Sequence, residues 1–183
     1  MITPLCFACQ LDRTEIAIKI IEAGADLNAP CSKGYYPLHY ACEKGNMIIL
    51  ESLIDHGVNL NVIRGKDHLS AVYSATIHNY YEFLHKLLSF GTSPNIKHIS
   101  GEYALHKAIS SEKWNFVELL LKFGADAKIE NKNNFSSYEL LILRSSNLIN
   151  ENLLKEAILN LELDGKLVVY LFSACEKGNL KVL

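Results

Sequence analysis

The sequence predicts an all-α solenoid of about five to six stacked helix-turn-helix units with short hairpin turns, and three observations support this fold class. One position of a repeat recurs with spacings of 33, 34, 33, 33 and 33 residues, at Ala8, Ala41, Ala75, Ala108, Leu141 and Ala174. Glycine recurs in the same phase at Gly24, Gly57, Gly91 and Gly124. Each of these glycines follows a segment whose apolar residues have helical spacing.

The segments before the glycines predict the second helix of each unit. Glycine readily adopts the left-handed conformation that commonly ends a helix, so we expect each of these helices to stop at its glycine. Their apolar residues are spaced to form one buried face and are Ile16, Ile20 and Ile21; Ile49, Leu53 and Ile54; Phe83, Leu87 and Leu88; and Phe116, Leu120 and Leu121.

Shorter apolar segments predict the first helices, and two of them begin Thr3-Pro4-Leu5 and Tyr36-Pro37-Leu38-His39. Proline suits the first turn of a helix because its missing N–H would be unpaired there. With these motifs the chain resembles the ankyrin-repeat family, whose units of 33 residues carry the pattern Thr-Pro-Leu-His-x-Ala. The resemblance covers about residues 1–140 strongly. It implies that turns and first helices line a concave surface and that His39 and His106 tie neighbouring turns together.

We expect a single array over residues 1–183, with units at about residues 1–30, 31–64, 65–97, 98–130, 131–163 and 164–183. The third unit has one extra residue near Arg64-Gly65, so we expect its turn to differ. The fifth unit is degenerate, because Phe135-Ser-Ser-Tyr-Glu139 replaces the initiating motif, and the sixth is truncated. Neither end carries the polar cap that a stacked array needs, which predicts that the chain belongs to a longer array or is a truncated relative of one.

Composition excludes several classes of function. The 18 Lys and Arg residues are balanced by 20 Asp and Glu, so the basic patch that duplex nucleic acid requires is not expected. No run of 18 apolar residues occurs, which argues against membrane insertion of this segment. Five cysteines fit a reducing cytosol better than a disulfide framework. We therefore expect a cytoplasmic, monomeric array, or one in a host cell cytosol if the chain is a microbial effector.

The residues that could carry chemistry have structural explanations. Cys6-x-x-Cys9 could bind a metal, but Cys9, Cys42 and Cys175 occupy one repeat position and Cys6 stands where the repeat has its histidine. No second pair completes a zinc site. Nucleophile and phosphate-loop motifs are also missing from the sequence. We expect no metal, no cofactor and no enzyme activity.

The repeat leaves turn and first-helix positions free for recognition, and we expect a partner protein to bind there. Tyr35, Leu69, Ile77 and Ile99 could form one apolar strip, although Leu69 and Ile99 could instead fold inward. The predicted partner-binding residues are Ser32, Lys33, Tyr35, Glu43, Lys44, Lys66, Asp67, Leu69, Ile77, His78, Ile99, Glu102 and Ser111.

The predicted function is a protein-binding scaffold or adaptor without catalysis. Two alternatives stay open, which are a regulatory or targeting segment of a larger enzyme or membrane protein, and a secreted microbial effector. The partner is not determined by the sequence, because the binding positions of a solenoid vary independently of its scaffold.

We predict that the native protein holds its five cysteines reduced and mostly protected, because they recur at core positions instead of converging. Titration with a thiol reagent, before and after denaturation, measures this. Zinc that stays bound stoichiometrically through dialysis would overturn the prediction.

Overall fold

The computed structural model describes residues 2–65 and 67–144, which belong to two compact units, residues 1–104 and 105–183. These described residues form nine helices and one two-stranded sheet, so the predicted all-α class is confirmed. The predicted second helix of the fifth repeat and the whole sixth repeat lie outside the described residues.

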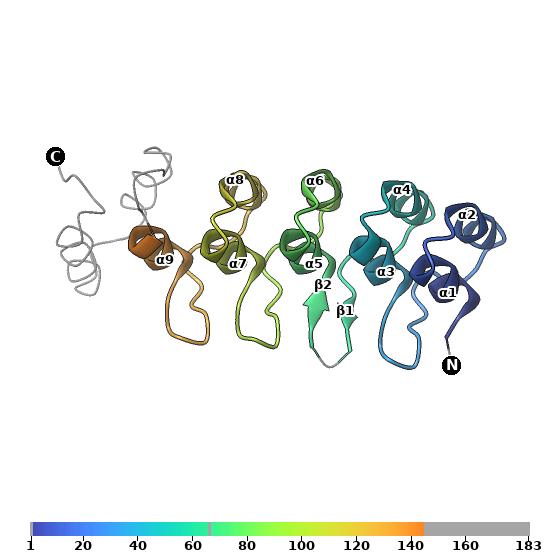
Figure 1. The fold of residues 1–183 in the computed structure, drawn as a ribbon, viewed down its shortest axis with the longest axis horizontal. Coiled ribbons are helices and arrows are strands. Elements are labelled where there is room, and N and C mark those ends of the chain that lie inside the picture. The colour runs from blue at the N-terminus through green and yellow to red at the C-terminus, as the bar shows by residue number, and fades with distance from the viewer. Residues whose placement is uncertain (1, 66, 145–183) are drawn as a thin grey trace. The chain divides into compact units, whose positions relative to one another are not determined.

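The first unit contains three helix pairs. Figure 1 shows its first helices side by side in one row and its second helices in another, with the loops that join successive repeats beyond the first row. The first helices are α1 (Pro4–Gln10), α3 (Pro37–Lys44) and α5 (Ala71–Ile77), and the second helices are α2 (Thr14–Glu22), α4 (Met47–Asp55) and α6 (Tyr81–Ser89). Contacts between α1 and α3, between α3 and α5, and between α2 and α4 stack the repeats.

The core of the first unit consists of the apolar faces that the repeat predicts. Ile49, Leu53, Phe83 and Leu87 are fully buried. The second helix of each repeat in this unit ends just before a glycine with positive φ. Ile16 departs from the prediction, because its side chain is 53% exposed. It occupies the same repeat position as Ile49, in the first of the described repeats.

The second unit contains α7 (Ala104–Ser110), which begins at the boundary between the units, α8 (Trp114–Lys122) and α9 (Ser137–Arg144). The start of α9 has a capping box: the Ser136 hydroxyl accepts from Glu139 N at 3.2 Å, and the Glu139 carboxylate accepts from Ser136 N at 2.6 Å. The fifth repeat, expected to be degenerate, therefore starts an ordered helix without proline. The Ser-x-x-Glu spacing is its signal in the sequence.

A hairpin loop, which we call a finger, precedes each first helix after α1. In the fingers 31–35, 98–102 and 131–135, the first residue donates its N–H to the carbonyl of the last, at 2.7, 2.9 and 2.9 Å. The finger 64–69 has the extra residue, and it is the one with β-strands, β1 (Ile63–Arg64) and β2 (Leu69–Ser70). The turn of the third repeat was expected to differ, and this is confirmed.

The first helices hold the fingers through one repeat position. His39 Nδ1 accepts from Tyr36 N at 3.3 Å, so the ring proton lies on Nε2, which donates to Leu69 O at 3.0 Å. Cys6 Sγ reaches Tyr35 O at 3.7 Å in the same way. The structural roles predicted for Cys6 and His39 are confirmed.

The positions equivalent to His39 in the later repeats are Tyr73 and His106, and both also contact the following finger. Tyr73 donates its hydroxyl proton to the Glu102 carboxylate at 3.3 Å and stacks on His98, with ring centroids 4.4 Å apart. Within the second unit, His106 Nε2 lies 3.1 Å from Phe135 O. The predicted structural role of His106 is confirmed as well.

We predict that the protein loses stability as pH falls, because of His39. Burial lowers the pKa of this imidazole from 6.5 to about 4. Between these two values the unfolded chain binds a proton that the folded protein excludes, so the free energy of unfolding should decrease from pH 7 to pH 4, by about 3 kcal/mol at most. Urea titrations at a series of pH values measure it.

His39→Asn should be less stable at pH 7 but should lose most of this pH dependence. The matched variant His56→Gln changes an exposed histidine and should keep it. If His39→Asn and the wild type lose stability in parallel between pH 7 and 4, another group causes the effect.

Candidate functional site

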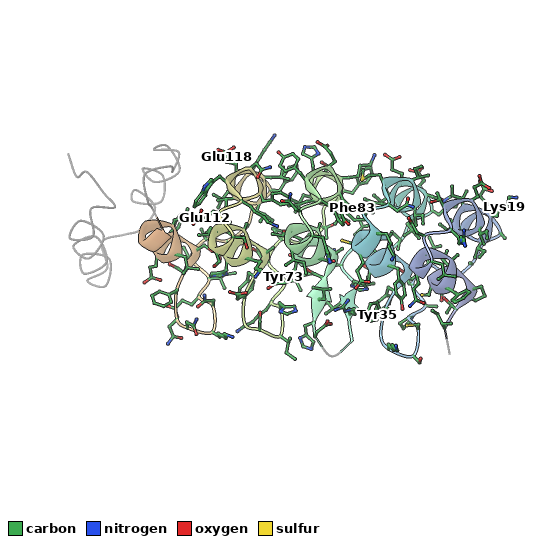
Figure 2. The ribbon with its side chains drawn as sticks, in the orientation of Figure 1. Lys19, Tyr35, Tyr73, Phe83, Glu112 and Glu118 are labelled. Carbon is green, nitrogen blue, oxygen red and sulfur yellow. The ribbon has the colours of Figure 1, made fainter. Side chains whose placement is uncertain are left out.

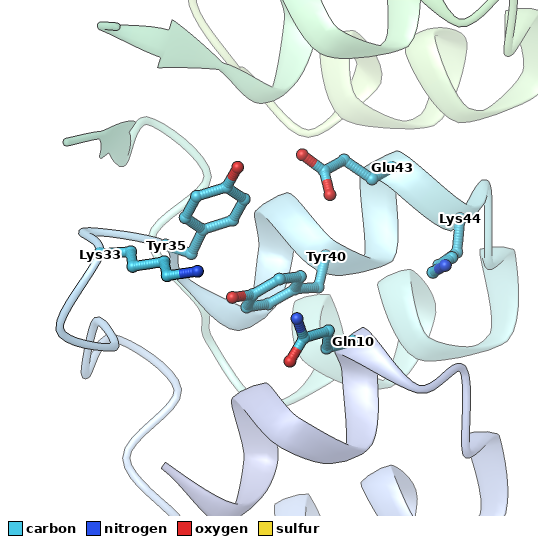
Figure 3. A pocket seen from close by; sticks show the side chains of 6 residues that line it. All are labelled: Gln10, Lys33, Tyr35, Tyr40, Glu43 and Lys44. Carbon is cyan, nitrogen blue, oxygen red and sulfur yellow. The ribbon is translucent and has the colours of Figure 1, made fainter. Parts of the chain in front are cut away.

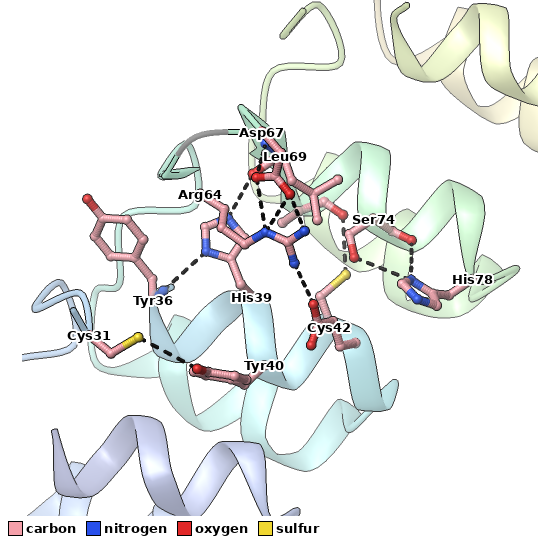
Figure 4. Close-up of polar contacts among 12 residues, drawn as sticks. Cys31, Tyr36, His39, Tyr40, Cys42, Arg64, Asp67, Leu69, Ser74 and His78 are labelled. Atoms are coloured by element: carbon pink, nitrogen blue, oxygen red, sulfur yellow. Dashed lines mark hydrogen bonds and ion pairs between the residues drawn. The ribbon is translucent and has the colours of Figure 1, made fainter. Parts of the chain in front are cut away.

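Arg64 organises the surface between the second and third repeats. It follows Cys31 by one period, at the first residue of its finger, and its side chain is only 15% exposed. One guanidinium nitrogen donates to Glu43 at 2.5 Å, on α3 of the preceding repeat. Nε donates to both carboxylate oxygens of Asp67, at 2.9 and 3.1 Å, and a second terminal nitrogen pairs with the same carboxylate. Figure 4 shows this fork of contacts.

Arg64 also covers an aromatic ring. Its guanidinium carbon lies 4.3 Å from the centroid of Tyr35, which in turn stacks on Tyr40 with centroids 4.8 Å apart. A guanidinium group over a ring is attracted by the negative face of the π-system. Arg64 therefore fixes the orientation of Tyr35 as well as the two carboxylates.

The contact between Arg64 and Asp67 favours the charged form of both side chains. The hydrogen bonds from Arg64 lower the pKa of Asp67, and the same contact raises the pKa of Arg64. Burial is the main cause of a raised pKa for Tyr35 and for Tyr40, so both phenols stay protonated at neutral pH. The cluster thus presents fixed charges and neutral phenols.

The tips of the fingers 31–35 and 64–69, which belong to the second and third repeats, meet closely. Gly65 N donates to Gly34 O at 3.2 Å, and a Cβ on Gly34 would lie 2.7 Å from Gly65 Cα. Gly34 also has a φ of 75°, which side chains rarely adopt. Only glycine at position 34 permits this approach, and it brings Arg64 within reach of the second repeat.

A pocket of about 220 Å³ lies beside this cluster. Figure 3 shows Tyr40 between Tyr35 and Gln10, with Lys33 directed toward the two rings. Its walls come from the first and second repeats, and its lining residues are Gln10, Lys33, Tyr35, Tyr40, Glu43 and Lys44. Four of the predicted partner-binding residues, Lys33, Tyr35, Glu43 and Lys44, are therefore brought together.

The predicted apolar strip is not continuous. Leu69 is 3% exposed, and both residues of its strand are buried, so the interpretation of Leu69 as an exposed anchor is wrong. Ile77 is 37% exposed and Ile99 is 64% exposed, so these two side chains are available at the surface. Tyr35, which Figure 2 labels, is half-buried and stacks on Tyr40.

The other predicted residues have varied surroundings. Ser32 and His78 are exposed, and His78 Nδ1 donates to Ser74 O at 2.9 Å. Glu102 is partly buried by its contact with Tyr73. Ser111 is exposed in the second unit, which is described by itself, and Lys66 lies outside the described residues.

Three members of the site were missed in the sequence: Arg64, Gln10 and Tyr40. Gln10 precedes Glu43 by one period, so the criterion that selected Glu43 would have found it. In the sequence, Arg64 is distinguished only by its place beside the inserted residue. Tyr40 is 5% exposed and belongs to the core as well as to the pocket floor, so no surface criterion would have selected it.

The arrangement is suited to binding. Across residues 2–65 and 67–144, no group of three or more His, Cys, Asp and Glu side chains could hold a metal ion. Cys6, Cys9, Cys31 and Cys42 are buried free thiols, and burial raises the pKa of Cys9 and Cys42 to about 12. The helices described are all too short or too polar to cross a membrane.

Comparison with known proteins identifies the repeats. A family model of three ankyrin repeats matches residues 5–98, and a model of one ankyrin repeat matches residues 100–134. NF-kappa-B inhibitor alpha of Gallus gallus is 32% identical over 164 residues, which cover 82% of this chain and 49% of that protein.

Two further relatives show the range of proteins that contain such repeats. A putative ankyrin repeat protein of Rickettsia felis is 28% identical over 71% of this chain and 45% of its own length. The transient receptor potential channel pyrexia of Drosophila melanogaster is 36% identical over 56% of this chain and 11% of its own length. The chain thus spans less than half of each of these three relatives.

We predict that Arg64→Lys destabilises the first unit by about 1–2 kcal/mol, because an ammonium group cannot form the bidentate fork or cover the Tyr35 ring. The free energy of unfolding from urea titration measures this. The matched change Arg13→Lys, at an exposed arginine, should shift stability by less than about 0.5 kcal/mol. Equal stability of the two variants would mean that the fork contributes nothing specific.

Proposed function

Because the chain belongs to the ankyrin-repeat family, we propose that it binds a partner protein through the surface formed by its fingers and the ends of its first helices. Ankyrin repeats are in general protein-interaction modules. The proposal rests mainly on the Arg64 cluster, which orders Tyr35, Glu43 and Asp67 at the surface without serving the repeat's own core. Ordered side chains lose little entropy on binding, which favours affinity.

The exposed apolar side chains support partner binding at the same surface. Ile77 ends α5 and Ile99 lies in the finger 98–102, and both are exposed. Exposed aliphatic anchors within a polar rim are typical of binding hot spots. We infer that Ile77 and Ile99 supply apolar contact area for the partner, and that the pocket beside Tyr35 supplies polar specificity.

We propose that the chain acts as a scaffold or adaptor without catalysis of its own, in a reducing cytosol. The buried free thiols support the compartment, because a protein of an oxidising compartment would more often pair them. A relative named as an inhibitor of NF-kappa-B supports a role that consists of holding another protein.

A second candidate is a regulatory or targeting segment of a larger protein. The match to a channel supports it, because the matched segment covers only 11% of that channel. Protein recognition by the same surface would serve either role.

We predict that Ile77→Ala and Ile99→Ala each weaken partner binding, by up to about 2 kcal/mol if they are anchors, while folding stability changes by less than about 0.5 kcal/mol. Leu69→Ala and Leu53→Ala should instead cost about 2–5 kcal/mol of folding stability, because each leaves a cavity in the core. Capture of partners by the immobilised protein, followed by titration of the captured partner, measures binding beside thermal melts.

If Ile77→Ala melts as early as Leu53→Ala, its side chain belongs to the core. If both isoleucine variants melt normally and bind normally, the partner uses another face, and the outer helices α2, α4 and α6 are the next to test.

A further inference from the structure

The pocket beside Tyr35 is too small for a typical ligand but suits a single side chain. Its volume is about 220 Å³, whereas pockets for drug-sized molecules usually have about 300–1,000 Å³. Tyr40 forms a buried floor, and Lys33, Lys44 and Gln10 are exposed at its rim. One extended side chain from a protein could therefore enter it.

The charges around the pocket favour an acidic side chain. Glu43 and Asp67 are both engaged by Arg64, but Lys33 and Lys44 form no ion pair with any residue of 2–65 and 67–144. The three cations and two anions leave one positive charge in excess. One carboxylate would balance it, whereas a polyanion would meet Glu43 and Asp67.

The polar and aromatic groups complete the complementarity. The stacked rings of Tyr35 and Tyr40 offer an apolar wall to the methylene groups of an acidic side chain. The Gln10 amide adds a neutral hydrogen-bond donor beside the floor. Arg64 already engages both neighbouring carboxylates and covers the outer side of Tyr35, so the lysines are left to meet the incoming charge.

We infer that this pocket captures an Asp or Glu side chain of the partner protein, between Lys33 and Lys44 and against the Tyr35–Tyr40 stack. This inference rests on the proposed function and assigns it a chemical specificity. The pocket would select partners by charge, and Ile77 and Ile99 would add apolar contact area. Binding would weaken as salt screens the lysines.

The test is selection of a random peptide library displayed on phage against the full chain. Three proteins are compared: the wild type, the charge reversal Lys33→Glu/Lys44→Glu, and the matched reversal Lys19→Glu/Lys128→Glu. The last changes two exposed lysines that do not line the pocket, and Figure 2 labels Lys19 on α2. Both variants carry the same net charge.

Peptides selected by the wild type and by the matched control should be enriched in Asp or Glu. Their affinity for Lys33→Glu/Lys44→Glu should fall about tenfold or more, because two attractions become repulsions. Replacing the peptide's acid by its amide should weaken binding to the wild type by a similar factor, but it should strengthen binding to Lys33→Glu/Lys44→Glu, because the amide removes the repulsion. That coupling locates the acid at the pocket.

The inference fails if the selected peptides show no acidic enrichment, if both reversals weaken binding equally, or if selection yields no peptide. Ile77→Ala separates this failure from failure of the proposed function. Peptides that lose affinity for Ile77→Ala but not for Lys33→Glu/Lys44→Glu would retain the proposed surface and reject the acidic pocket. Peptides insensitive to both changes would reject both.

Discussion

The described structure depends on the contact that each first helix makes with the finger after it. A finger is a short loop, and one of its carbonyls or side chains contacts the preceding repeat at a buried or partly buried position. Cys6, His39 and Tyr73 supply the partner in the first unit, and His106 does so in the second. Each such bond contributes about 1 kcal/mol, but a buried group left unpaired costs more. A thiol, an imidazole and a phenol each make this contact between a first helix and the next finger.

This constraint explains how the third finger accommodates an inserted residue. His39 holds Leu69 O at the end of the finger, so the extra residue must be absorbed at the tip. The tip lengthens, its flanks pair as β1 and β2, and Gly65 meets Gly34 of the preceding finger. Arg64 then lies over Tyr35 and between two carboxylates. An irregularity in the repeat thus places the arginine that contacts Tyr35, Glu43 and Asp67.

In the finger 64–69, some side chains belong to the core and others belong to the candidate site. Leu69 pairs with Arg64 across the hairpin and is buried, while the side chains of Arg64, Glu43 and Asp67 stay partly exposed. Tyr40 serves both purposes, because its ring closes the core and forms the floor of the pocket. Binding specificity can therefore change at Lys33, Lys44 or Gln10 with little effect on the fold, whereas changes at Tyr40 would affect both.

The helices, their glycine stops and most of the core could be predicted from the sequence, because these features depend on residues within one repeat and on a strict period. The histidine contacts were implied by the resemblance to the ankyrin-repeat family. The capping box of Ser136 and Glu139 was readable but was passed over, because the proline motif was expected there.

The candidate site was only partly predictable, and tertiary structure decided the rest. Gln10 and Glu43 are 33 residues apart in the chain, and they line one pocket because stacked repeats place equivalent positions side by side. Leu69 could have faced either way, because one inserted residue reverses which side of a hairpin a side chain occupies. The sequence by itself determined the repeat and its scaffold through local periodicity. The packing of one finger on the next decided which side chains remain free to bind, because that choice depends on contacts between repeats.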